Sequence, residues 1–305
     1  MTGQAPRLGC VYLPQTPPER LAAIARIADQ AGLAELWLWE DCFLAGGISS
    51  AAIALSNSSS LTVGLGVAPV PMRNPALTAM EIATLVRAFP GRVRVGLGHG
   101  VQDWMAQIGA RVASPMTLLR EHLICIGALL RGEAVTFNGR YVRLHDVALD
   151  WPPTEAAELL LAAIGPKTLR LSGELATGTI LTQGTSPADL RAAVAQVREG
   201  NAAGGRGPTS IVTYLLCTTG PDAASQMTAE YRRWGLQDDA DVGVVGTAHD
   251  IADGLARWTE AGADTVVLQP PVDADIEQFV TFVGNELTPL VNRRWAESVN
   301  ETGDS

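Results

Sequence analysis

The chain has 305 residues, 47% hydrophobic and 18% charged, a composition that supports a large folded core and argues against disorder. Its formal net charge of −10 makes nucleic acids and anionic membranes poor partners, and we expect neither. Four isolated cysteines without metal spacing, together with the lack of a signal peptide or a bilayer-length apolar run, predict a cytoplasmic protein.

Short apolar strands alternate with amphipathic helices along nearly the whole chain. In chain order, strands are expected at residues 8–13, 35–38, 61–67, 93–98, 159–163, 179–181, 211–217 and 265–268. Helices are expected after them, the last at 273–291, followed by a polar tail beyond Ala296. Eight strands in this alternation predict an α/β fold, a (β/α)8 TIM barrel. A doubly wound open sheet is the alternative, and it would need fewer strands.

Two local signals refine this pattern. Capping spacings at Thr16-Pro17-Pro18-Glu19, Ser186-Pro187-Ala188-Asp189 and Thr247-Ala248-His249-Asp250 predict helix starts. Residues 135–137 and 141–144 flank Asn138-Gly139, a dipeptide favoured by two-residue hairpin turns. We expect a β-hairpin insertion at about 133–153, before the fifth barrel strand, within one domain spanning 1–305.

Function in such a barrel gathers at the C-terminal ends of the strands. Asp41 follows the second expected strand, where it could bind a polar ligand, act as a base, cap a helix or form a surface salt bridge. His99, in the glycine loop 96–100, could be a general acid/base, a donor to a cofactor or a structural donor. Arg73 could pair with an anion or pin its own loop. Cys42 is a weaker candidate, because no histidine stands beside it in the sequence.

The turn after the fifth expected strand has the local sequence of an anion site. Pro166 suits the first turn of a helix, and we expect the amides of Lys167 and Thr168 to lack acceptors within that helix. The positive end of the helix dipole favours a phosphate there, and Gly165 leaves room for its approach. An ordinary strand-to-helix joint shares these features.

Seven stretches resemble the luciferase-like monooxygenase superfamily, specifically its coenzyme F420-dependent and flavin-dependent oxidoreductases. They are ELWLWED (35–41), VAPVPMRNP (67–75), RVRVGLGHG (92–100), WMAQIGA (104–110), SPMTLLRE (114–121), GPKTLRLSGELATG (165–178) and AGADTVVLQP (261–270). The similarity spans nearly the whole chain and keeps the order of the family.

The resemblance implies a (β/α)8 barrel that binds F420, or alternatively FMN, at its C-terminal mouth. It implies a non-prolyl cis peptide at Gly66–Val67, in a bulge that backs the deazaflavin ring. Residues expected at the cofactor are Asp41, Gly66, Val67, Gly98, His99, Gly100, Ala163, Ile164, Gly165, Pro166, Lys167 and Thr168. Residues expected near the substrate are Cys42, Met72, Arg73 and Trp104. Because the family often dimerises, we also expect a homodimer.

At two positions this chain differs from one subfamily, and the difference argues against that subfamily's reaction. The F420 enzymes that oxidise sugar phosphates carry histidine after the aspartate and glutamate after the glycine loop, where this chain has Cys42 and Val101. Sugar-phosphate oxidation is therefore disfavoured. The sequence predicts hydride transfer between F420, or a reduced flavin, and a small organic substrate, with Asp41 or His99 handling a proton.

Three alternatives remain open at this point. An FMN-dependent luciferase-like monooxygenase shares the same barrel and motifs. A barrel that binds a cofactor without turnover is the second, since the acid and base of the sugar-phosphate enzymes are absent. A metal-dependent aldolase or isomerase is the third, but no ligand cluster with metal spacing is found, so we expect no metal.

Overall fold

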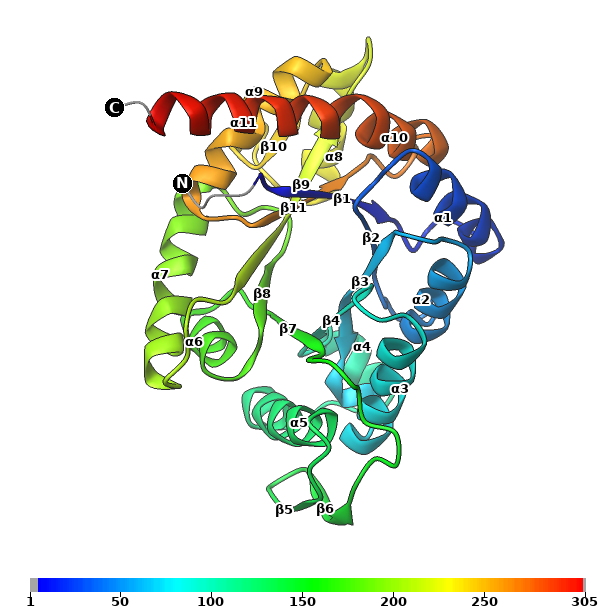
Figure 1. Ribbon diagram of the computed structural model, residues 1–305, viewed down its shortest axis with the longest axis vertical. Helices are drawn as coiled ribbons and strands as arrows, with labels where there is room; N and C mark the ends of the chain where they lie inside the picture. The colour runs from blue at the N-terminus through cyan, green and yellow to red at the C-terminus, as the bar shows by residue number, and fades with distance from the viewer. Residues whose placement is uncertain (1–4, 304–305) are drawn as a thin grey trace.

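The computed structural model describes residues 5–303, and it contains a closed barrel of eight parallel strands. Around the barrel these are β1 (Arg7–Tyr12), β2 (Glu35–Leu38), β3 (Thr62–Pro69), β4 (Val93–Gly98), β7 (Glu158–Ala162), β8 (Gly178–Leu181), β9 (Ser210–Thr218) and β11 (Thr265–Gln269). The barrel closes because β9 pairs with both β8 and β11, and β11 pairs with β1 (Figure 1). This confirms the predicted TIM barrel over the open sheet.

Helices surround the strands (Figure 1). They are α1 (Leu21–Gln30), α2 (Gly47–Ser56), α3 (Pro75–Ala88), α4 (Gln102–Gln107), α5 (Pro115–Leu130), α6 (Pro166–Leu175), α7 (Pro187–Ala203), α8 (Ala223–Arg233), α9 (Ala248–Ala261), α10 (Ile276–Phe282) and α11 (Thr288–Gly303). No helix in the described part of the chain is both long and apolar enough to span a membrane.

Large aromatic side chains fill the barrel interior, and glycines make the room. Trp37 is fully buried inside the barrel with apolar side chains from several strands. A Cβ on Gly64 would lie 2.3 Å from the Trp37 ring, and one on Gly66 would lie 2.0 Å from the Tyr214 hydroxyl oxygen. Because real Cβ atoms do not approach so closely, the glycines of β3 are required by these rings.

A buried charged cluster links the strands at the other end of the barrel. Arg94 of β4 binds Glu35 of β2 at 3.0 Å and Glu158 of β7 at 2.8 Å. It also donates to the hydroxyl groups of Thr265 on β11, at 3.1 Å, and Ser210 on β9, at 3.4 Å. One guanidinium therefore joins five strands, which Arg's fork of donors permits.

The helix caps are partly as predicted. Ser186 and Thr247 accept the expected backbone amides, and Thr247 with Asp250 forms a full capping box. The expected cap at Thr16 is wrong. A 3-10 turn at Pro18–Arg20 begins there instead, and its N-cap is Pro17, whose side chain has no acceptor.

The predicted hairpin is present, but its turn is longer than expected. Strands β5 (Val135–Asn138) and β6 (Arg143–Val147) pair antiparallel, so the connection is 139–142 and not a two-residue turn. The carboxylate of Glu121 on α5 accepts the amides of Arg140, Tyr141 and Val142 at 2.7–2.8 Å. Glu121, about 20 residues earlier in the chain, thus fixes the conformation of this turn, which lies beside α5 in Figure 1.

The end of the chain differs from the prediction. The single helix expected at 273–291 is α10, a π-helical segment at Val283–Leu287 and α11 in succession. The expected polar tail beyond Ala296 is helical as far as Gly303, while its last residues, 304–305, lie outside the described residues. A short strand that the sequence did not predict, β10 (Gly243–Val245), pairs with the end of β9.

Candidate cofactor site at the barrel mouth

A cavity of about 490 Å³ opens at the C-terminal ends of the strands. Its wall includes residues of β3, of the loops after β2, β4, β7 and β8, of β9, and the residue after α8. Many of the residues predicted from sequence meet there: Asp41, Gly66, Val67, Gly98, His99, Gly100, Trp104, Ala163, Ile164, Gly165 and Thr168. Residues from separate strand ends are therefore brought together as the barrel architecture requires.

A neighbouring cavity of about 690 Å³ extends this space to the start of α6. The two cavities share His99, Gly100, Gly165 and Thr168 in their walls. The second adds Pro166 and Lys167, together with the residues that begin α5. The two cavities thus adjoin between the barrel mouth and a helix N-terminus, an arrangement suited to a ring with an anionic tail.

The Gly66–Val67 peptide in this wall is cis, as the family resemblance implied. The pairing of β3 with β4 shifts register between Leu65 and Ala68, which makes the expected bulge. A Cβ on Gly98 would lie 2.6 Å from the Val67 side chain. The glycine of β4 therefore lets Val67 occupy the surface of the cleft.

The start of α6 differs in one hydrogen bond from the expectation. Thr168 N–H donates to the Gly165 carbonyl at 3.0 Å, so the prediction that this amide lacks an acceptor is wrong. Pro166 has no N–H to donate. Among the described residues, the Lys167 amide is therefore the one N–H of this first turn without a backbone acceptor. A Cβ on Gly165 would meet no atom within 4 Å, so an anion can approach this end of the helix.

His99 lies where the two cavities join. Its Nε2 is 3.4 Å from the Thr168 hydroxyl, and its Nδ1 is buried with no hydrogen-bond partner among the residues described. Burial lowers the pKa of His99, which keeps the imidazole neutral at pH 7. Because protein atoms cover Nδ1, only the Nε2 side of this neutral ring is available for a hydrogen bond to a ligand.

Two carboxyl groups line the mouth cavity, those of Glu40 and Asp41, and among the described residues the Asp41 carboxyl has no cationic partner. Burial raises the pKa of Asp41, and no positive charge among the described residues offsets it. The adjacent Glu40 differs, because both of its oxygens bind the Arg73 guanidinium at 2.6 Å. Its Oε1 also accepts the first amide of α2, from Gly47 at 2.8 Å.

Three residues predicted near the substrate do not line the cavity. Arg73 is held by Glu40 and lies 3.4 Å from Glu81, so its guanidinium pins the loop that carries it. The sulfur atoms of Cys42 and Met72 lie 3.7 Å apart, outside the cavity wall. Burial raises the pKa of Cys42, and the charges of Glu40 and Asp41 raise it further, which disfavours a reactive thiolate.

The family comparison agrees with this geometry. A family described as luciferase-like monooxygenase matches residues 5–240 of the chain. The protein belongs to the luciferase-like monooxygenase family. Within the described residues, no group of three or more His, Cys, Asp or Glu side chains could hold a metal ion in this family member.

Curated relatives in the family include F420-dependent enzymes. A 5,10-methylenetetrahydromethanopterin reductase of Methanolobus tindarius is 29% identical over 223 residues, covering 72% of this chain and 68% of that protein. An F420-dependent hydroxymycolic acid dehydrogenase of Mycobacterium tuberculosis is 29% identical over 287 residues, covering 87% and 79%. The solved structure of coenzyme F420-dependent tetrahydromethanopterin reductase from Methanopyrus kandleri shares the fold, with a TM-score of 0.82 at 20% identity over 94% of this chain and 99% of that one.

Sequence reasoning missed the aromatic side of this luciferase-like site. Trp39 and Trp234 have ring centroids 6.3 Å apart, and Trp39 and Tyr214 are 5.7 Å apart, both in edge-to-face geometry. Thr182 and Gln183 complete this side of the cavity. Trp39 could have been found by counting two residues on from Trp37 along β2, because alternate residues share a face. Trp234 follows α8, and no local signal points to the mouth.

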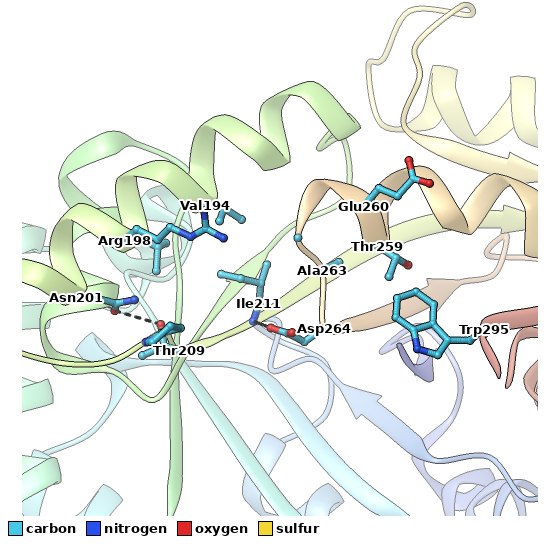
Figure 2. A pocket seen from close by; sticks show the side chains of 13 residues that line it. Val194, Arg198, Asn201, Thr209, Ile211, Thr259, Glu260, Ala263, Asp264 and Trp295 are labelled. Atoms are coloured by element: carbon cyan, nitrogen blue, oxygen red, sulfur yellow. Dashed lines mark hydrogen bonds between the residues drawn. The ribbon is translucent and has the colours of Figure 1, made fainter. Parts of the chain in front are cut away.

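A further cavity of about 470 Å³ lies between α7, α9 and α11 and is seen in Figure 2. Asp264 accepts the Ile211 amide at 2.8 Å, and Asn201 accepts the Thr209 hydroxyl at 3.3 Å, so these polar side chains already have protein partners. It lies at the N-terminal ends of β9 and β11, where residues of luciferase-like barrels are expected to serve stability.

Proposed function

We propose that this protein is an oxidoreductase that transfers a hydride between coenzyme F420 and a small organic substrate. The observation that carries the proposal is the pair of adjoining cavities between the barrel mouth and the start of α6. The F420-dependent dehydrogenase among its relatives supports the same cofactor. When bound, F420 accepts or donates the hydride, and the protein supplies orientation and electrostatics.

The residues present fit such a cofactor. Gly66, Val67, Gly98 and Gly100 would offer a flat backbone surface to the ring. Ala163, Ile164, Gly165, Pro166, Lys167 and Thr168 would hold the tail, with the Lys167 amide and side chain meeting its negative charge. The Nε2 of His99 and the Thr168 hydroxyl, 3.4 Å apart where the cavities adjoin, would offer polar contacts to the tail.

Asp41 is the proposed proton-handling group. It lines the cavity, and because burial raises its pKa it can exchange a proton nearer to neutral pH than an exposed aspartate. It would take the proton that oxidation of an alcohol releases and return it in the reverse direction. His99, neutral at pH 7, is the second candidate for this role. Trp104 lines the same space and would contact the substrate.

An FMN-dependent monooxygenase is the second candidate, and the family match itself favours it. Titration of the purified protein with F420 and separately with FMN, followed by fluorescence, distinguishes the two. We expect saturable F420 binding, with FMN at least tenfold weaker. Saturable binding of FMN alone would make the protein a flavin enzyme, and binding of neither would contradict both candidates.

A charge-reversal variant sharpens this test. Gly165 has φ −81° and open space around it, so Gly165→Asp and Gly165→Asn both fit, and both are good helix N-caps. We expect Gly165→Asp to weaken F420 binding at least tenfold, because its carboxylate repels the anionic tail. The isosteric, uncharged Gly165→Asn should keep most of the affinity. Equal affinity of the two variants would place the anion elsewhere.

We also propose a homodimer formed through α2 and α3. Ile53 on α2 is 40% exposed, and Leu77 and Met80 on α3 are 43% and 51% exposed, which is high for large apolar side chains. Light scattering should give twice the chain mass, and Met80→Glu should shift the protein toward the monomer. A wild-type monomer at micromolar concentration would contradict this proposal.

We propose a reducing, cytoplasmic location. All four cysteines are free, and Cys10, Cys125 and Cys217 are buried thiols. Unpaired cysteines are typical of compartments that keep thiols reduced. Recovery of the native protein in the cytosolic fraction would support this, and recovery outside the cell membrane would contradict it.

A further inference from the structure

Assigning the β3, β4 and β7 rims, apart from Trp104, to the cofactor leaves one further side of the mouth cavity for the substrate. This substrate side comes from β9, from the segments that follow β2 and β8, and from the residue after α8. Its members are Trp39, Asp41, Thr182, Gln183, Tyr214 and Trp234. The inference below rests on the proposed F420 function.

The charges of this side exclude an anionic group. No arginine or lysine lines the 490 Å³ mouth cavity in the described residues. Glu40 is neutralised by Arg73, and Asp41 would repel a second negative charge. A carboxylate or phosphate entering here would lose its water without gaining a cationic partner, which is costly in a buried site.

The walls of this side are aromatic. The rings of Trp39, Tyr214 and Trp234 form an edge-to-face series with centroids 5.7 Å and 6.3 Å apart. The half-buried rings of Trp39 and Trp234 offer apolar contact area to a ligand, while Tyr214, which is 2% exposed, supports Trp39 from within the barrel. Polar groups are few, so they can recognise only one or two atoms of a substrate.

A buried carboxylate fixes the outermost ring of the series. Glu230 is only 3% exposed, and its Oε2 accepts the Trp234 indole N–H at 3.2 Å. Its Oε1 accepts the Val272 amide at 3.4 Å, in the loop after β11, and the Arg233 guanidinium at 3.2 Å. Glu230 therefore ties the end of α8, and with it Trp234, to the barrel.

We propose that the substrate is an uncharged, mostly apolar molecule with one hydroxyl or carbonyl group. Its apolar body packs on Trp39 and Trp234, and its oxygen forms a hydrogen bond with Asp41. Trp234 determines specificity through this contact. Glu230 is a positioning residue that acts through Trp234.

Matched ligand pairs test the charge rule on the F420-loaded protein. Cyclohexanone and 4-oxocyclohexanecarboxylate, and two or three analogous ketone and keto-acid pairs, differ only in one carboxylate. Quenching of tryptophan fluorescence should show the ketones binding at least tenfold more tightly than their acids. Equal or tighter binding of the acids overturns the inference, and so does a failure of every ketone to bind.

A variant of the substrate side should reverse this preference. Gln183→Lys supplies the missing cation, and we expect it to improve binding of the keto acids relative to the ketones at least tenfold. Gln183→Met has a similar length and no charge, and it should keep the preference for ketones. An unchanged ratio in Gln183→Lys would place the substrate away from this side.

The positioning role has its own readout. Glu230→Leu should raise KM for the best ketone or alcohol about tenfold with kcat within about threefold, while Glu230→Gln, which keeps an acceptor, should stay near wild type. Trp234→Leu gives a second route to the same change in KM if Glu230→Leu folds poorly. The positioning role would be overturned if kcat fell as much as KM rose in all three variants. F420 affinity, measured alone, should stay unchanged, and its loss would count against the proposed function instead.

Discussion

Asp41 shows at the scale of one residue how burial and chemistry are linked. Its carboxyl group lies in the mouth cavity, and burial raises its pKa with no nearby cation to compensate. A raised pKa means that the folded state holds the proton more tightly than the unfolded state. The associated stability is therefore fully present below the ordinary aspartate pKa and is lost as pH rises through the raised value.

Replacing Asp41 with asparagine should separate catalysis from stability. Asp41→Asn removes the charge that is unfavourable at neutral pH, so we expect the Tm at pH 7 to stay equal or rise. Turnover should fall about a hundredfold or more, because a general acid/base contributes roughly that factor. Thermal unfolding at several pH values and steady-state kinetics measure both effects. Full activity, or a clear drop in Tm at pH 7, would contradict the role of Asp41.

Some site residues were predictable one at a time and others were not. His99 directly follows β4 and Gly165 lies three residues after β7, so their place at the barrel mouth follows from sequence and from the position of strand ends in a barrel. Arg73 also follows a strand, but its guanidinium is taken by Glu40, 33 residues away. Whether a charged group is free or paired depends on such long-range contacts, which sequence spacing does not reveal.

At the scale of elements, the hairpin β5–β6 depends on Glu121 of α5. Burial raises the pKa of Glu121, but its hydrogen bonds from the amides of Tyr141, Val142 and Arg140 outweigh burial and lower the pKa overall. The stability that it contributes is present above the ordinary glutamate pKa and is lost as pH falls through the lowered value.

Removing this carboxylate should loosen the turn at residues 139–142. Glu121→Ala leaves three backbone amides without their acceptor, and we expect a loss of about 3 kcal/mol in the free energy of unfolding. Glu121→Gln keeps part of the contact and should lose less. The hydrogen-exchange protection factors of the amides at 140–142, which correct for the intrinsic pH dependence of exchange, should fall in the Ala variant and, in wild type, at acid pH. Unchanged protection of these amides would rule out the assignment.

The strands were predictable because they are mostly apolar and turn residues bound them, as in β2 and β4, whose predicted bounds match the structure. Strand β10 was not, since it has three residues and only Val244 of them is buried. The π segment before α11 was also not predicted, and it packs closely on another element, because a Cβ on Gly284 would lie 2.4 Å from the Ala31 carbonyl oxygen. Sequence patterns predict elements whose own residues carry the signal, and they miss those set by packing.

At the scale of the whole molecule, the two ends of the barrel differ in composition: one holds the candidate site and the other a buried charged cluster. The mouth carries Asp41 and the free start of α6, while the opposite end carries the Arg94 cluster that joins five strands. Figure 1 shows both chain ends on the same side of the molecule as α11, away from the hairpin. We therefore expect that stability and cofactor binding can be altered separately.

Arg94→Met tests this division. In this variant the only cationic partner left to the buried Glu35, in the part of the chain that the structure describes, is Arg7, whose guanidinium is partly exposed. Because the buried charge is then poorly compensated, we expect a loss of about 3 kcal/mol in the free energy of unfolding. Adding Glu35→Gln removes the buried charge and should recover part of that loss. F420 affinity of the folded fraction should stay within about twofold of wild type. Denaturant unfolding and F420 titration measure the two quantities, and a tenfold loss of affinity would contradict the division.

The most direct measurement is a crystal structure of the protein with F420 bound. The account predicts the ring against Val67 and the glycines of β3 and β4, with the negatively charged tail within hydrogen-bonding distance of the Lys167 amide. Asp41 and Trp234 should face the exposed side of the ring. F420 seated elsewhere, for example in the cavity beside Trp295 in Figure 2, would contradict the central claim.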